Sequence, residues 1–157
     1  MKDLPEEHIE ALKIVGTAAD SIAQEVHVVG GYVRDYFLGR IKDQGPLDID
    51  FVTMGSGIRL AEVVADHIPG SNLSIFKQFG TAQVKSGDLE LEFVGARKES
   101  YRRNSRKPLV EDGSFEDDQL RRDLTINALS WSLNPDSFGT LHDPFGGLQD
   151  MKERLIR

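Results

Sequence analysis

The fold is decided by residues 26–53, which read VHVVGGYVRDYFLGRIKDQGPLDIDFVT. The apolar run Val26–Val29 predicts a short strand that leads into a pair of glycines. Residues 32–38 predict a helix, because a glycine, a usual residue at a helix end, follows them. Residues 48–53 alternate polar and apolar side chains, which indicates a second strand. The two strands therefore frame a glycine turn, a short helix and a pair of aspartates.

The flanking sequence predicts the remaining elements. Apolar residues at helical spacing indicate helices within residues 5–25 and 58–68. Residues 79–84 and 89–94 alternate around a glycine-containing turn, which is a hairpin signal. Residues 97–118 lack periodicity and are rich in charge, so we expect a mobile loop there. This order of elements predicts an α+β domain with a small mixed β-sheet, helices packed on one face, and the other face left for a ligand.

Composition narrows the class of protein. A chain of 157 residues with 39% hydrophobic and 29% charged residues has the size and composition of one globular domain. It contains no cysteine, which excludes disulfides and thiolate metal sites. It has no apolar run of the roughly 20 residues that a membrane helix needs, and its acidic N-terminus is unlike a signal peptide. We therefore expect a cytoplasmic protein, and its net charge of −7 argues against a large basic surface for nucleic acid.

Asp48 and Asp50 are the first candidate metal ligands. Because they lie two positions apart on a predicted strand, their side chains point to one face, while Leu47, Ile49 and Phe51 point into the core. Carboxylates this close repel each other unless a cation lies between them. Mg²⁺ suits the place, since it prefers oxygen ligands and takes the others from water and phosphates. The alternative for an isolated D-x-D pair is a solvated strand with two ordinary aspartates.

Gly30 and Gly31 are candidates for phosphate binding. They follow a predicted strand and precede a predicted helix, where backbone N–H groups can hold a phosphate. Arg34, one turn into that helix, is placed to reach the same anion. A glycine pair alone more often marks a tight turn. Together with the downstream aspartates, it predicts a phosphate cradle beside a metal site.

A third carboxylate would complete a two-metal site for in-line displacement. Glu90 and Glu92 are the candidates, because they alternate with apolar residues along a predicted strand. We favour Glu92 of the two. The alternative is that these glutamates serve solubility alone.

The segment RRDLTINAL, residues 121–129, offers further nucleotide contacts. Arg122 can pair with a triphosphate, while Asp123 and Asn127 can form hydrogen bonds to a sugar or to backbone groups. The alternative interpretation is the capped start of a helix, with a polar residue followed by apolar ones.

Four segments in order resemble one family of enzymes. They are VVGGYVRDYFLGR (28–40), LDIDFVT (47–53), RRDLTINAL (121–129) and DPFGGLQDMKERLIR (143–157). Together they resemble the successive motifs of class II CCA-adding enzymes (tRNA nucleotidyltransferases) and bacterial poly(A) polymerases. The strand LEFVGAR (91–97) also resembles a family strand that carries an additional carboxylate, in support of Glu92.

The resemblance implies a polymerase-beta-like nucleotidyltransferase head in which Asp48 and Asp50 hold Mg²⁺. The nucleotide contacts that it implies, shared by ATP and CTP, are Gly31, Arg34 and Arg122. Asp123 and Asn127 are implied to help hold the nucleotide and the loop that precedes them. The implied reaction is attack of a tRNA 3′ hydroxyl on the α-phosphate, with release of pyrophosphate, as in CCA addition. No histidine is required, and the four histidines form no cluster in the sequence.

Three other functions remain open at this point. A poly(A) polymerase and a specialised CC-adding or A-adding enzyme share these head motifs. A non-catalytic RNA-binding module belongs to another class, and loss of either D-x-D aspartate would have favoured it. Both aspartates are present, so the enzyme is the preferred interpretation.

The family also suggests how the chain is divided. We expect residues 1–147 to form the head and residues 148–157 to begin a neck helix. In the family, an acidic-arginine motif on that helix chooses the nucleobase, and the body and tail grip tRNA. We therefore expect a head without these parts, with little activity alone, which suits the acidic charge of the chain.

A basic cluster lies in the predicted loop. Its residues are Arg97, Arg102, Arg103, Arg106 and Lys107. We expect this cluster to contact RNA or the leaving pyrophosphate. The alternative is a solvated loop whose charge is balanced by the acidic residues of 111–118. In the family the matching loop is mobile and helps the enzyme switch between CTP and ATP.

Overall fold

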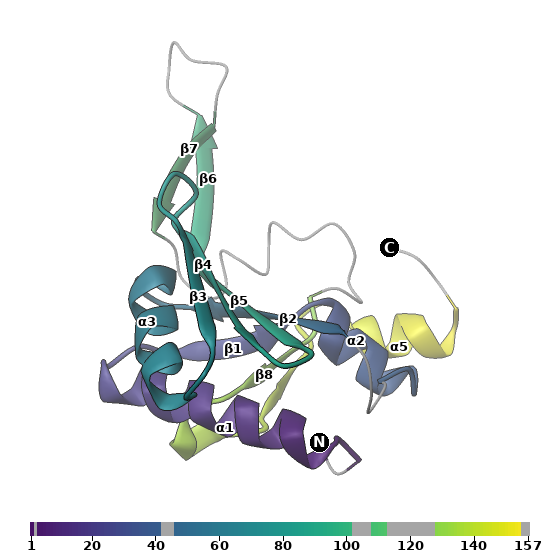
Figure 1. The fold of residues 1–157 in the computed structure, drawn as a ribbon. Helices are drawn as coiled ribbons and strands as arrows, with labels where there is room; N and C mark the ends of the chain where they lie inside the picture. The colour runs from purple at the N-terminus through teal and green to yellow at the C-terminus, as the bar shows by residue number, and fades with distance from the viewer. Residues whose placement is uncertain (2, 42–45, 102–107, 113–127, 155–157) are drawn as a thin grey trace.

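The computed structural model describes residues 1, 3–41, 46–101, 108–112 and 128–154. These residues form a seven-stranded mixed sheet with helices against it and a separate two-stranded sheet (Figure 1). The large sheet has the strand order β3-β4-β5-β2-β1-β8-β9, and the small one pairs β6 with β7. In chain order the elements are α1 (Glu6–Ser21), β1 (Val26–Val29), α2 (Gly31–Phe37), β2 (Leu47–Thr53), α3 (Gly57–His67), β3 (Asn72–Phe76), β4 (Thr81–Ser86), β5 (Leu89–Gly95), β6 (Arg97–Tyr101), β7 (Pro108–Asp112), β8 (Ser130–Ser132), the 3₁₀ turn η2 (Pro135–Ser137), β9 (Leu141–His142) and α5 (Gly147–Lys152).

Helices α1 and α3 cover one face of the large sheet. The buried apolar residues of α1 recur at helical spacing and join the core that Leu60 and Val64 of α3 also enter. The sheet contributes Phe51 and Phe93, whose rings stack with centroids 5.0 Å apart. None of the described helices is long and apolar enough to cross a membrane.

Strands β2 and β5 form the parallel pair at the centre of the sheet. Their register places Phe51 beside Phe93, Asp48 beside Glu90 and Asp50 beside Glu92. A parallel pair needs a long connection, and here the chain passes through α3, β3 and β4 between the two strands. This pairing puts the two acidic strands next to each other.

Two close contacts hold α1 and β1 to the end of β8. Gly16 of α1 lies against the backbone of Leu133, and a side chain at this position would begin 1.9 Å from the Leu133 carbonyl oxygen. Asn134 accepts a hydrogen bond from the Val26 N–H at 2.9 Å and donates one to the Gln24 carbonyl at 2.8 Å. The half-buried asparagine amide thereby fixes the start of β1 and pairs the Val26 N–H and the Gln24 carbonyl.

The fold predicted from the sequence is confirmed, with two corrections. The mixed sheet and the helices on one face are present, and the hairpin β4–β5 turns at Gly87 with φ 57°. The loop predicted over residues 97–118 is wrong for two stretches of it, because β6 and β7 pair as antiparallel strands. Strand β3 was not predicted, since all of its residues are exposed and it has no buried apolar face.

Candidate active site

Four carboxylates form a compact acidic cluster on the face of the sheet opposite the helices. Asp48 and Asp50 are exposed on β2, while the alternating Ile49 and Phe51 are fully buried. Glu90 and Glu92 are half-buried on β5 and stand directly beside the two aspartates in the register. The pleat therefore gathers all four carboxylates, the acidic cluster, on one open surface.

Hydrogen bonding, burial and neighbouring charges raise the pKa values of two glutamates in the acidic cluster. A hydrogen bond with Asp48 and the charge of Asp48 raise the pKa of Glu90. Burial raises the pKa of Glu92, and the charges of Asp50, Asp48 and Glu90 raise it further. The cluster thus carries more negative charge than its surroundings neutralise, which is the condition that a bound cation relieves.

The donor chemistry of the acidic cluster suits a divalent cation. Among the described residues, no three or more histidine, aspartate or glutamate side chains are already arranged as a cage around a metal ion. Mg²⁺ needs no such cage, because it is usually bound through one or two carboxylates, with waters and substrate phosphates as its other ligands. Two adjacent aspartate oxygens on an open face meet that requirement.

Replacing Glu92 with glutamine is expected to stabilise the metal-free protein at neutral pH. A carboxyl whose folded-state pKa is raised favours folding only at pH values below its unfolded pKa, and this contribution is lost as the pH rises through the folded pKa. At pH 7.5 in EDTA, Glu92→Gln should raise Tm by roughly 1–3 °C, the shift produced by at most about 1 kcal/mol in a protein of this size.

Thermal unfolding at two pH values tests this expectation. At pH 4 the difference between Glu92→Gln and the unaltered protein should shrink, because both side chains are then largely neutral. Glu62→Gln, on the exposed surface of α3, is the matched control and should leave Tm unchanged. A lower Tm for Glu92→Gln at pH 7.5 would contradict the argument that burial and neighbouring charges disfavour the ionised Glu92.

The glycine pair forms a sharp turn between β1 and α2. Gly30 has φ 72° and ψ −135°, a conformation that only glycine adopts without strain. Its N–H donates a 3.3 Å hydrogen bond to the Leu129 carbonyl, which ties the turn to the chain just before β8. The turn begins immediately after Val29, the residue paired with Asp50. The predicted phosphate cradle therefore lies next to the acidic cluster.

The guanidinium of Arg34 folds back over this turn. Its Nη2 atom would lie 3.4 Å from a Cβ placed on Gly31, so the guanidinium lies directly beside this glycine. The Arg34 Nε also forms a 3.1 Å ion pair with Asp35, and both side chains are about one-third exposed. A partly exposed arginine beside the start of a helix is suited to bidentate binding of an anion.

Several predicted site residues lie outside the described part of the chain. They are Arg102, Arg103, Arg106, Lys107, Arg122, Asp123 and Asn127. The backbone of Arg97 begins β6. The roles predicted for these seven residues and for the Arg97 side chain stay predictions.

The structure adds polar residues on the same face that sequence reasoning missed. Ser130 is fully buried beside Val29, and its hydroxyl has no hydrogen-bond partner among the described residues. His27 and His142 lie close together, with ring centroids 5.1 Å apart, and both contact the Ser132 hydroxyl. The histidines are therefore not all scattered as the sequence suggested, because β8 brings together strands that are distant in sequence.

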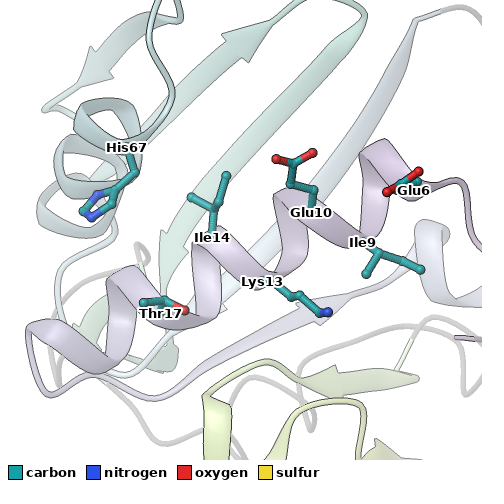
Figure 2. A pocket seen from close by; sticks show the side chains of 7 residues that line it. All are labelled: Glu6, Ile9, Glu10, Lys13, Ile14, Thr17 and His67. Carbon is teal, nitrogen blue, oxygen red and sulfur yellow. The ribbon is translucent and has the colours of Figure 1, made fainter.

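A pocket of about 460 Å³ lies elsewhere on the molecule. Figure 2 shows its lining, with side chains of α1 such as Glu10 and Ile14 facing His67 of α3. These helices pack on the face opposite the acidic cluster, and the His67 Nδ1 is already hydrogen-bonded to the Val63 carbonyl at 2.8 Å. The pocket therefore belongs to the outer surface of the helix layer and takes no part in the candidate site.

A strand pair that carries aligned carboxylates beside a glycine turn is the arrangement of a nucleotidyltransferase head. The model of the poly(A) polymerase head domain matches residues 26–157. The chain belongs to this family, and the resemblance found in its four motifs is confirmed.

Relatives of the chain include named tRNA enzymes. An A-adding tRNA nucleotidyltransferase of Aquifex aeolicus is 47% identical over 131 residues, which cover 83% of this chain and 15% of that protein. An A-adding tRNA nucleotidyltransferase of Halalkalibacterium halodurans is 35% identical, over 98% of this chain and 35% of that protein. The chain thus spans about a third or less of the length of these relatives.

Solved structures of similar sequence share the fold. A CCA-adding enzyme in an apo form superposes with a TM-score of 0.87 at 36% identity, covering 99% of this chain and 36% of that chain. A tRNA nucleotidyltransferase complexed with a primer tRNA and an incoming ATP analog gives a TM-score of 0.76 at 43% identity, covering 91% of this chain and 38% of that chain.

Proposed function

We propose that this chain is the catalytic head of a template-independent RNA nucleotidyltransferase that adds CMP or AMP from CTP or ATP to the 3′ end of tRNA. The observation that carries the proposal is the aligned acidic cluster on the open face of the sheet, beside a glycine turn with an arginine folded over it. Membership of the poly(A) polymerase head family and the names of the relatives support it. We assign residues 1–147 to the head and residues 148–157 to the start of a neck helix.

The residues divide into two functional groups. Asp48 and Asp50 would hold Mg²⁺, with Glu92 as the third carboxylate beside them. Around the triphosphate, the binding groups would be Gly30, Gly31, Arg34, Arg122, Asp123 and Asn127. The chemistry that a bound divalent cation supplies is stabilisation of charge on the phosphates and a lower pKa for the attacking hydroxyl.

The reaction is one displacement at phosphorus. The 3′ hydroxyl oxygen of the RNA bonds to the α-phosphorus, the bond from that phosphorus to the β-bridging oxygen breaks, and pyrophosphate leaves while the hydroxyl proton is released. The turn shaped by Gly30 would orient the triphosphate for this displacement through the backbone N–H of Gly31, because the Gly30 N–H is already hydrogen-bonded to the Leu129 carbonyl. Arg34 would neutralise charge on the leaving phosphates. Orientation and charge stabilisation supply most of the catalysis in phosphoryl transfer.

Calorimetric titration of ATP, CTP, GTP and UTP into this chain, with and without Mg²⁺, tests the proposal. We expect Mg²⁺-dependent binding of all four nucleotides with similar affinity, because the proposed binding groups would contact the phosphates and the metal and would not select the base. Failure of every nucleotide to bind in the presence of Mg²⁺ would count against a catalytic head.

A second candidate is a specialised A-adding enzyme, since three of the relatives carry that name. Two tRNA substrates distinguish it from a CCA-adding enzyme, one ending at the discriminator nucleotide and one already ending in CC. Extension of only the second substrate, with ATP as donor, indicates A addition.

A further inference from the structure

The β3–β4 hairpin exposes aromatic side chains at one edge of the large sheet. Phe76, at the end of β3, is 42% exposed, and Phe79, in the turn, is 66% exposed. Strand β3 pairs only with β4 among the described strands, so it forms the sheet edge. Proteins usually protect such edges or use them for binding, and large exposed aromatics at an edge indicate a contact surface.

The strand register places Phe76 on the same face as the acidic cluster. Phe76 pairs with Thr81, whose neighbour on β5 is Val94, one alternation beyond Glu92. The preceding residue, Ile75, pairs with the buried Ala82 and therefore faces the helix layer. Three strand spacings separate β3 from β2, or roughly 14 Å, which is the length of about four stacked nucleotides.

The charge of the hairpin differs from that of the rest of the chain. Between Asp66 and Asp88 there is no acidic residue, although the whole chain has a net charge of −7. Within this stretch Lys77 lies in the turn beside Phe76, and Lys85 lies on β4. Both lysines are exposed. Lys85 stands opposite Glu90 and is already close to a carboxylate, whereas Lys77 is next to Phe76. An exposed aromatic beside a lysine, on a segment without acidic residues, suits a polyanion with flat bases better than it suits another acidic protein surface.

We propose that Phe76, Phe79 and Lys77 form a stacking surface for the single-stranded 3′ end of the RNA substrate. This inference rests on the proposed function and adds the place where the nucleotides next to the reacting end are held. A base stacks on the Phe76 ring, and Lys77 neutralises the neighbouring phosphate. The strand then runs across β4 and β5 toward the aspartates, so the same face of the sheet carries both the RNA end and the incoming nucleotide.

The test uses the full 157-residue chain and a fluorescein-labelled RNA hairpin with a single-stranded 3′ tail of four nucleotides. Fluorescence anisotropy measures its affinity and that of a blunt hairpin with the same stem. Phe76→Ala should weaken binding of the tailed RNA about tenfold, within the range of losses found for single stacking aromatics, and should leave binding of the blunt RNA unchanged. Phe76→Trp should retain the affinity, because the stacking ring remains.

Ile75→Ala is the matched control. Ile75 is the adjacent residue, is 39% exposed and lies on the other face of the same strand, so general damage to the hairpin affects both variants alike. Equal affinities for Phe76→Ala and Ile75→Ala would overturn the proposal. So would the absence of measurable binding of the tailed RNA by the unaltered chain. Self-association of the chain that Phe76→Ala abolishes would instead assign the surface to a second copy, and would also overturn it.

Nucleotide titration separates this proposal from the proposed function. Phe76→Ala should bind ATP in the presence of Mg²⁺ as the unaltered chain does, since β3, which carries Phe76, lies three strands from β2, which carries Asp48 and Asp50. If ATP binds but the tailed RNA is insensitive to Phe76, only the stacking surface is wrong. If the unaltered chain binds no nucleotide, the proposed function fails first.

Discussion

Substitution of Gly16 by alanine is expected to lower the free energy of unfolding by about 3 kcal/mol, the upper part of the usual range for an overpacked core. The added Cβ would lie 1.9 Å from the carbonyl oxygen of Leu133 and 2.7 Å from its carbonyl carbon. Both are backbone atoms, and the Leu133 N–H is itself hydrogen-bonded to the Val26 carbonyl at 3.1 Å. The backbone at Leu133 cannot shift without losing this hydrogen bond, so α1 must move away from the sheet.

The expected sign opposes helix propensity. In an exposed helix, glycine to alanine stabilises by about 1 kcal/mol, so a loss of stability isolates the steric clash. Urea denaturation measures the midpoint, and Thr17→Ala, the next residue on the exposed side of α1, is the control that should not lower it. A midpoint for Gly16→Ala equal to that of the unaltered protein would mean that α1 does not pack as closely as the structure has it.

Asparagine at position 50 is expected to weaken Mg²⁺-dependent ATP binding by at least about tenfold. Even residues that only orient metal ligands typically contribute 10–100-fold to metal affinity, and Asp50 is proposed as a ligand itself. The change removes one negative charge from the centre of the acidic cluster and keeps the size of the side chain.

Calorimetry with ATP, with and without Mg²⁺, measures this loss. Asp20→Asn is the control, because Asp20 is exposed on α1, which packs on the opposite face, and the change removes the same charge. The two variants should separate only when Mg²⁺ is present. Equal affinity of Asp50→Asn and Asp20→Asn for the Mg²⁺ complex of ATP would remove Asp50 from the proposed metal site.

Local sequence pattern predicted the strands of the site but not their pairing. The alternation of Asp48 and Asp50 with apolar residues was enough to place both carboxylates on one face. The same alternation put Glu90 and Glu92 on one face of β5. Nothing in either segment specifies that β2 and β5 are parallel neighbours. Their pairing depends on how the intervening chain, α3 and the β3–β4 hairpin, packs against the sheet.

The elements that sequence analysis missed lack a buried face or depend on distant partners. Strand β3 is exposed along its whole length, and its polar and apolar side chains alternate only over Asn72–Ile75, the shortest run that indicates a strand. Strands β6 and β7 carry charged residues without a regular apolar alternation, a pattern that is typical of a loop. The approach of His27 to His142 depends on two strand pairings through β8, which no local pattern encodes.

The parallel pairing of β2 with β5 ties the site to the completion of folding. Its two acidic strands are joined by a crossover that contains a helix and a hairpin, so the carboxylates meet only after this intervening chain has docked. Bringing them together concentrates negative charge, a cost that the core contacts of Phe51 and Phe93 must offset. A ligand that binds only the assembled cluster therefore draws the population toward the native state. Ligand binding at the acidic cluster and the free energy of unfolding are in this way linked. A substitution far from the acidic cluster can therefore reduce the proposed nucleotide binding by lowering the fraction of folded chain.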